Sequence, residues 1–176
     1  NPILAVSVRD WPSDVPFKTY MASALDRFIS QYGVSVVFLP MHGEHDMESS
    51  QSVVNMMENS AYIAPHTQSI EEKIALIGQA DMLLGMRLHA LIFAATEGTP
   101  FVALSNDPKI DAFSNIVGQK VVAHVNEYSW NERQLFESLE YLLLNHADIT
   151  LLLNDRASEL KQKAKQTAEM AIKLFD

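Results

Sequence analysis

The chain has 176 residues, enough for one domain with a substantial core, and its composition of 48% hydrophobic and 20% charged residues is that of a globular protein. A net charge of −9 argues against a large nucleic-acid-binding face and against docking on anionic lipid. The sequence has no cysteine, which excludes disulfides, thiolate metal sites and cysteine nucleophiles. No apolar run approaches the roughly 20 residues of a membrane span. The N-terminus lacks the layout of a signal peptide and enters a strand without an initiator Met. We therefore expect a trimmed or processed chain, one lobe of a larger protein.

Short apolar runs alternate with amphipathic helical stretches along the chain. The predicted elements are, in order, strand 3–8, helix 18–32, strand 34–39, helix 47–59, strand 62–64, helix 70–79, strand 81–85, helix 87–97, strand 101–104, helix 108–117, strand 120–123, and helices 131–145 and 148–175.

Start and stop signals bound several of these helices. Ser69 with Glu72 three residues later predicts a capping box for helix 70–79. Asp46 and Asp107 are the predicted N-caps of helices 47–59 and 108–117, and Pro108 suits a first helical turn. Three helices are predicted to end at a glycine that tolerates the left-handed cap, namely Gly33, Gly98 and Gly118.

The strands are apolar throughout, which is typical of a sheet covered on both faces. Their alternation with helices predicts an α/β fold with a doubly wound, mostly parallel, Rossmann-like sheet of order 3-2-1-4-5-6. We expect a single domain over residues 1–176, with a core at 1–125 and C-terminal helices at 126–176.

The last predicted helix is about 40 Å long at 1.5 Å per residue, longer than a small sheet is wide. Its apolar stripe consists of Leu153, Ala157, Leu160, Ala164, Ala171 and Leu174. This stripe fits either an ordinary amphipathic cover helix or a strut that packs against a second lobe.

Ligands of doubly wound sheets bind beyond the carboxyl ends of the strands. Polar residues gather there in this chain, at Arg9, Asp10, His42, Glu44, His45, Asp46, Arg87, His89, Ser105, Asn106, Asp107 and Lys109. By contrast, the sequence contains no Gly-rich dinucleotide fingerprint, no P-loop and no Gly-x-Ser-x-Gly elbow.

The sharpest of these features runs from Gly85 to His89. Gly85 allows a tight turn from strand to helix, and Arg87 and His89 then lie at a helix N-terminus, where anions are favoured. Arg9 ends the neighbouring strand, so Arg9 and Arg87 could converge on one ligand, and two guanidiniums suit a carboxylate plus a phosphate. Equally open are a carboxylate partner for Arg87, a capping role for His89, and a surface pairing of Arg9 with Asp10 or Asp14.

Two further loops carry candidate residues. His42 and His45 resemble a metal motif, but they follow a strand and no third ligand is evident, so we expect no metal site. An acid–base or acceptor-contacting role for His42 or His45 stays open. Lys109 could reach a phosphate, although a well-capped helix start already explains Asp107 and Pro108.

The motifs together resemble the polysaccharide pyruvyl transferase family, and the bacterial cell-surface anchoring (CsaB-like) type in particular. The resemblance covers roughly residues 3–120, and its most specific part is the Arg87-Leu88-His89 block with the helix that follows. The supporting segments are 5–9 with Trp11, 38–40 with Asp46, 80–81, 98–100 and 105–109.

The resemblance implies the C-terminal lobe of a GT-B-like two-lobe enzyme whose N-terminal lobe is absent from this chain. Such enzymes transfer the enolpyruvyl carbons of phosphoenolpyruvate to a glycan or lipid-linked saccharide, forming a pyruvate ketal; in the anchoring type, the ketal marks the cell-wall polysaccharide that holds S-layer proteins. It further implies a cytoplasmic enzyme that could work at the inner face of the membrane, without a metal or cofactor.

The resemblance implies that Arg87 and His89 correspond to the family's Arg-x-His donor positions and that Arg9 corresponds to its first-strand arginine. On this basis His89 is the expected acid, and Arg9 and Arg87 neutralise the phosphate and the carboxylate; Lys109 and His42 are further expected contacts. Two alternatives stay open: the nucleotide-sugar-binding lobe of a GT-B glycosyltransferase, and a non-catalytic module that interacts, for example as a homo-oligomer, through its last helix.

Overall fold

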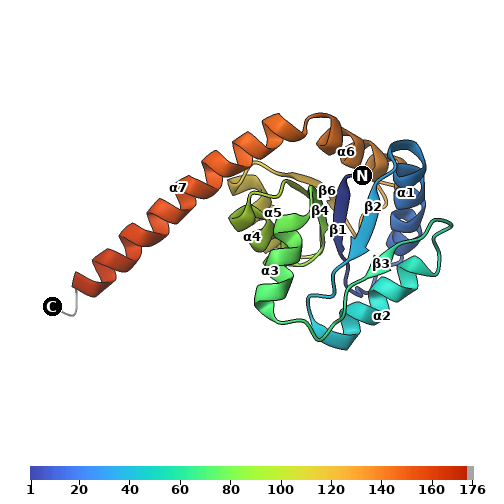
Figure 1. The fold of residues 1–176 in the computed structure, drawn as a ribbon, viewed down its shortest axis with the longest axis horizontal. Helices are drawn as coiled ribbons and strands as arrows, with labels where there is room; N and C mark the ends of the chain where they lie inside the picture. Colours follow the sequence, from blue (N-terminus) through green and yellow to red (C-terminus); the bar gives the residue numbers. More distant parts are fainter. Residues whose placement is uncertain (174–176) are drawn as a thin grey trace.

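The computed structural model describes residues 1–173, with side chains as far as Met170. In this part of the chain, six parallel strands form one sheet in the order β3-β2-β1-β4-β5-β6, which confirms the predicted order (Figure 1). The strands are β1 (Ile3–Ser7), β2 (Ser35–Phe38), β3 (Tyr62–Ile63), β4 (Met82–Gly85), β5 (Phe101–Ser105) and β6 (Lys120–His124).

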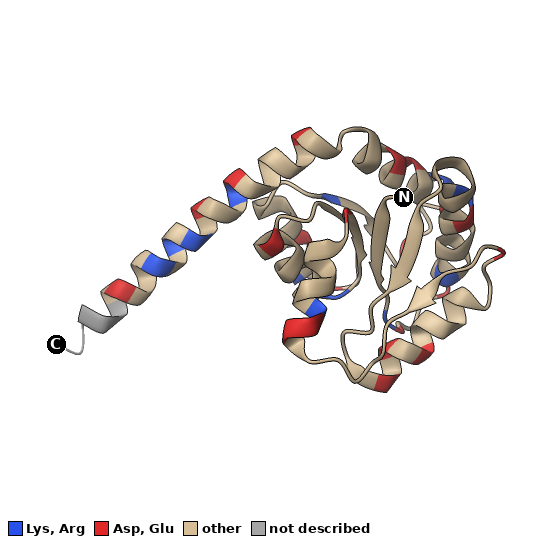
Figure 2. Ribbon diagram, in the orientation of Figure 1, with Lys and Arg blue, Asp and Glu red and all other residues tan. Residues whose placement is uncertain are grey.

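Within residues 1–173, seven helices connect and cover the strands, so the doubly wound α/β class is confirmed. They are α1 (Phe17–Tyr32), α2 (Gly43–Val54), α3 (Ile70–Gln79), α4 (Leu88–Glu97), α5 (Pro108–Ile116), α6 (Glu132–Leu144) and α7 (His146–Lys173). Lys, Arg, Asp and Glu residues lie mainly on these helices and on the loops (Figure 2). Among the helices of this part of the chain, none is long and apolar enough to cross a membrane.

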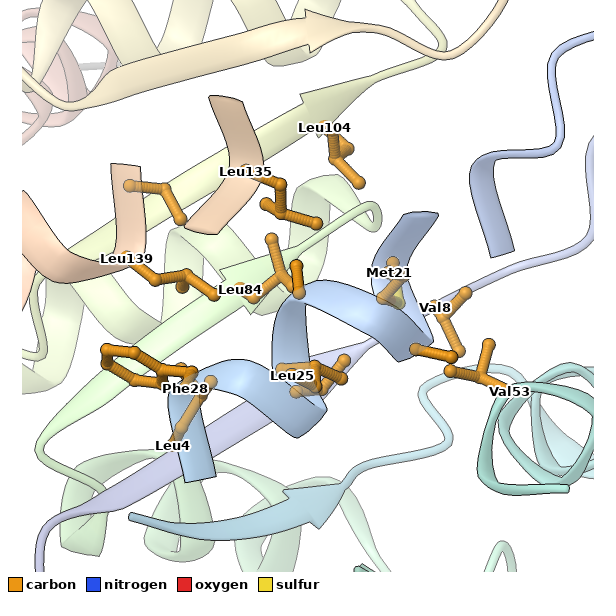
Figure 3. Close-up of a cluster of buried hydrophobic side chains, with 14 of the residues drawn as sticks. Leu4, Val8, Met21, Leu25, Phe28, Val53, Leu84, Leu104, Leu135 and Leu139 are labelled. Carbon is orange, nitrogen blue, oxygen red and sulfur yellow. The ribbon is translucent and has the colours of Figure 1, made fainter. Parts of the chain in front are cut away.

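Alternating strand residues divide the interior into two cores, because successive side chains of a strand point to opposite faces. Leu4 and Leu84 face the first core, which α1 and α6 cover with Leu25, Phe28 and Leu139 (Figure 3). The second core holds the alternate strand residues Ala5, Leu83 and Ala103 with residues of α3, α4, α5 and α7. Helices on both faces explain why the strands are apolar throughout.

The predicted N-terminal caps of α3 and α5 are confirmed. The Ser69 hydroxyl accepts from the Glu72 amide at 3.2 Å, and the Glu72 carboxylate accepts from the Ser69 amide at 2.8 Å, which is the predicted capping box of α3. Asp107 caps α5 by accepting from the Lys109 amide at 2.8 Å.

The predicted N-cap at Asp46 is wrong. Helix α2 begins at Gly43, three residues earlier, and ends at Val54 rather than at residue 59. The Asp46 carboxylate therefore lies inside the first turn, where it accepts from the His42 amide at 2.9 Å. A partly buried partner elsewhere in the fold, Arg87, draws this carboxylate inward.

Helix α7 first packs on the domain and then extends away from it (Figure 1). Leu153 is fully buried and Ala157 nearly so, whereas residues 161–170 are all exposed. The predicted apolar stripe is therefore covered only in the first half of the helix. The side chain of Ala171, together with Leu174 and Phe175 of the predicted helix, lies outside the described residues.

Candidate functional site

Strand pairing brings the two predicted arginines to one edge of the sheet. Ser7 of β1 pairs with Gly85 of β4, and Arg9 and Arg87 each follow two residues beyond this pair. Glycine at position 85 leaves room for the Leu91 side chain of α4, because a Cβ there would force the end of that side chain to move. The tight β4–α4 turn thus places Arg87 immediately before α4, beside the end of β1.

Arg87 is held by a buried carboxylate. It donates from Nε to one Asp46 oxygen at 3.0 Å and from Nη2 to the other, a two-point ion pair between residues 41 positions apart. The Asp46 side chain is 1% exposed and that of Arg87 is 21% exposed. Two of the five guanidinium N–H groups are used in this way, so three remain for a ligand. Arg87 therefore has the carboxylate partner that one sequence interpretation expected. It also lines the strand-end cavity described below, where its role as an anion clamp stays a prediction.

Arg9 has no carboxylate partner within ion-pair distance among the described residues. Asp10, one of its two suggested partners, instead pairs with Lys18 at 2.8 Å. The Arg9 guanidinium lies 5.0 Å from the centre of the Trp11 ring, and its Nε is buried without a hydrogen-bond partner. Burial first, and then repulsion from Arg87, lower the pKa of Arg9 from its ordinary value. A cation that is partly desolvated and lacks a counter-ion favours the binding of an anionic ligand, which accepts its hydrogen bonds.

A cavity of about 150 Å³ lies where these strand ends meet, and we call it the clamp cavity. Its lining residues are Arg9, Met86, Arg87, Leu88, His89, Asn106, Asp107, Lys109 and Ile110. Four of the five predicted site residues, Arg9, Arg87, His89 and Lys109, are thus brought together. The cavity is also close to the N-terminus of α5, where the helix dipole favours negative charge.

The fifth predicted residue, His42, faces a different cavity. This lysine cavity, of about 230 Å³, is lined by Met41, His42, Ile70, Lys73, Arg87, His89 and Phe93. Arg87 and His89 therefore line both cavities. His45 is exposed and lines neither cavity. No three His, Asp or Glu side chains within the described residues gather as metal ligands would.

Lys73 is the functional candidate that sequence reasoning missed. It is 7% exposed, although lysine is among the residues least often buried. One signal was available, because Lys73 lies one helical turn before the fully buried Ile77 and therefore on the inward face of α3. A more open hollow of about 550 Å³ along α2 is lined by Met47, Glu48, Gln51, Ser52, Asn55 and Met56 and offers no cation.

Comparisons with known proteins complete the description. The family model described as polysaccharide pyruvyl transferase matches residues 2–108. No curated protein matches the chain.

Solved structures with similar folds come from other enzymes. A family 9 glycosyl transferase from Veillonella parvula is 20% identical over 82% of this chain and 46% of its own, with a TM-score of 0.61. ADP-heptose LPS heptosyltransferase II from E. coli is 17% identical over 83% and 47%, with a TM-score of 0.62. The C-terminal domain of a group 1 glycosyl transferase from Francisella tularensis is 12% identical over 90% and 85%, with a TM-score of 0.64. The chain thus spans slightly less than half of the first two, and these likenesses show the fold.

Proposed function

The chain belongs to the polysaccharide pyruvyl transferase family, and we propose that it binds phosphoenolpyruvate at the clamp cavity and transfers the enolpyruvyl carbons to a sugar as a pyruvate ketal. The observation that carries this proposal is the unpaired, partly desolvated Arg9, which faces the same cavity as Arg87 and Lys109. Three cations with a single lining carboxylate, Asp107, suit a donor that bears both a phosphate and a carboxylate.

The chemistry requires an acid and charge neutralisation. Protonation of the donor's methylene carbon creates an oxocarbenium-like centre at C2, one sugar hydroxyl adds there, and a second hydroxyl closes the ketal as phosphate leaves. Of the two hydroxyl protons, one balances the proton that forms the new methyl group and the other leaves with phosphate. His89, which lines both cavities, is the proposed acid, and Arg9 and Arg87 stabilise the departing phosphate. The proposed reaction uses no cofactor or metal.

We expect the acceptor to be a cell-wall polysaccharide precursor, free or lipid-linked and reached at the inner face of the membrane, whose ketal anchors S-layer proteins. A second lobe of the same enzyme would then complete the acceptor site. The fold likeness to glycosyltransferases favours one other candidate, a lobe that binds a nucleotide-sugar, and this lobe would prefer UDP or another nucleotide to phosphoenolpyruvate.

Calorimetric titration separates these proposals. Phosphoenolpyruvate should bind the wild-type chain, and Lys109→Met should weaken that binding at least about tenfold, the size of one charge-assisted hydrogen bond. Lys120→Met is the matched control, because Lys120 is exposed at the opposite, amino end of β6. Binding of UDP without binding of phosphoenolpyruvate would favour the nucleotide-sugar lobe, and binding that Lys109→Met leaves unchanged would contradict the clamp.

A further inference from the structure

The buried lysine of α3 has unused hydrogen-bonding capacity. Lys73 donates from Nζ to the Met41 carbonyl at 3.2 Å, and no carboxylate pairs with it among the described residues. An ammonium group carries three N–H donors, and a buried cation with one carbonyl partner is poorly compensated. Two donors are therefore left for a group that the protein itself does not supply.

The lysine cavity is built for an anion next to an apolar group. Its polar lining consists of nitrogen-bearing side chains, namely His42, Lys73, Arg87 and His89, and it includes no carboxylate. A carboxylate needs donors alone, and the two cationic side chains, Lys73 and Arg87, carry donors and no acceptor. Ile70 and Phe93 line the same cavity and offer an apolar surface beside these donors.

Arg87 connects this cavity with the clamp cavity. Asp46 fixes its Nε and Nη2, and the free N–H groups belong to a guanidinium that lines both spaces. His89 lines both as well. Each cavity then adds a lysine of its own, Lys109 in one and Lys73 in the other.

We infer that the two cavities are the two halves of one donor site, in which the clamp cavity holds the phosphate of phosphoenolpyruvate and the lysine cavity holds its carboxylate. This assignment rests on the proposed function. Phosphoenolpyruvate carries both anionic groups on the same carbon, C2, which would lie against the shared residues Arg87 and His89. The doubly charged phosphate takes the half with Arg9 and Lys109, and the singly charged carboxylate takes the half with Lys73 and the apolar wall. Lys73 thereby selects donors that bear a carboxylate over other phosphate monoesters.

The test uses the whole donor and its two parts. Phosphoenolpyruvate, inorganic phosphate and pyruvate are each titrated calorimetrically into the wild-type chain, Lys73→Met, Lys109→Met and the matched control Lys161→Met. Lys161 also donates to a backbone carbonyl, that of Thr96, but lies on α7 away from both cavities. Lys73→Met should weaken the binding of phosphoenolpyruvate and of pyruvate at least about tenfold, and it should change the affinity for phosphate less than about twofold. Lys109→Met should weaken the binding of phosphate. Phosphate and pyruvate should be able to bind the wild-type chain at the same time.

The outcomes separate this inference from the proposed function. Phosphoenolpyruvate binding that depends on Lys109 but not on Lys73 would overturn the divided site and leave the proposed function standing. Equal losses of affinity for phosphate and for phosphoenolpyruvate in Lys73→Met would also overturn the divided site. Failure of the wild-type chain to bind phosphoenolpyruvate would overturn both. If Lys73→Met does not fold, His42→Ala tests the same half, because the His42 side chain makes no capping bond and is exposed. His42→Ala should weaken the binding of phosphoenolpyruvate and leave the affinity for phosphate unchanged.

Discussion

Asp46 and Arg87 form a two-point ion pair that joins the first turn of α2 to the residue before α4. The carboxylate is 1% exposed, so it has lost nearly all of its hydration and depends on Arg87 and on the His42 amide for compensation. This pair fixes the direction of the guanidinium that lines both cavities.

Removing one partner of this buried pair should destabilise the fold. We expect Asp46→Ala to lower the free energy of unfolding by about 3 kcal/mol, because Arg87 is left partly buried without its counter-ion. Urea unfolding followed by circular dichroism measures the change. Asp10→Ala is the control, since the Asp10 side chain is 80% exposed and its pair with Lys18 should contribute less than about 1 kcal/mol. Similar losses in the two variants would contradict the role given to burial.

Arg9 is expected to favour anion binding without stabilising the folded chain. Its guanidinium is charged at neutral pH although burial and Arg87 disfavour that charge, so Arg9→Met should leave the free energy of unfolding unchanged or raise it by up to about 1 kcal/mol. Phosphate at 100 times its dissociation constant should stabilise the wild-type chain by about 2.7 kcal/mol, and the variant much less. Thermal melts with and without phosphate report both effects. Arg133→Met, at an exposed site on α6, should keep the phosphate effect, and an equal phosphate effect in Arg9→Met would exclude Arg9 from the site.

The pKa of Asp10 should depend on Lys18. The hydrogen bond from Lys18, followed by its charge, lowers the pKa of Asp10 below the ordinary value. Because the folded-state pKa is depressed, the pair's small contribution to stability is present above the unfolded pKa of about 4 and is lost as pH falls through the folded-state pKa. In Lys18→Met the pKa should rise toward its ordinary value, which an NMR titration of the carboxyl carbon measures. An unchanged pKa would mean that the ion pair does not form in solution.

Gly98 should be harder to replace than Gly33, although both end helices with a positive φ, +79° and +64° respectively. Gly33→Ala should cost about 1–2 kcal/mol, because the left-handed backbone disfavours a Cβ. Gly98→Ala should cost more, since its Cβ would lie 2.7 Å from the Asn154 side-chain oxygen of α7, whereas nothing lies within 4 Å at Gly33. Chemical denaturation of both variants provides the comparison. Equal costs would contradict this prediction and would mean that the exposed Asn154 side chain moves aside without loss.

Local signals in the sequence were sufficient for the fold. Apolar runs, the Ser69–Glu72 capping box and the Asp107 cap depend on residues a few positions apart, so their physics is contained in short segments. The strand order also followed, because parallel connections with helices on both faces leave few arrangements. The rule that ligands bind beyond the carboxyl ends of the strands pointed to Arg9, Arg87, His89 and Lys109, and these four residues line one cavity.

Tertiary structure alone decided the partners of these residues. The residue type and position of Asp46 predicted a helix cap, but its carboxylate faces inward because Arg87, 41 residues later, offers a stronger partner than a backbone amide. Lys73 of α3 is buried against the loop at Met41 and His42, and its Nζ donates to a carbonyl 32 positions earlier in the chain. Burial and long-range ion pairing depend on elements distant in the chain, and a pattern read over one helix turn does not contain them. The sequence therefore determined the fold and the edge of the sheet at which the candidate residues gather, whereas packing decided which of these cations have a charged partner within the protein.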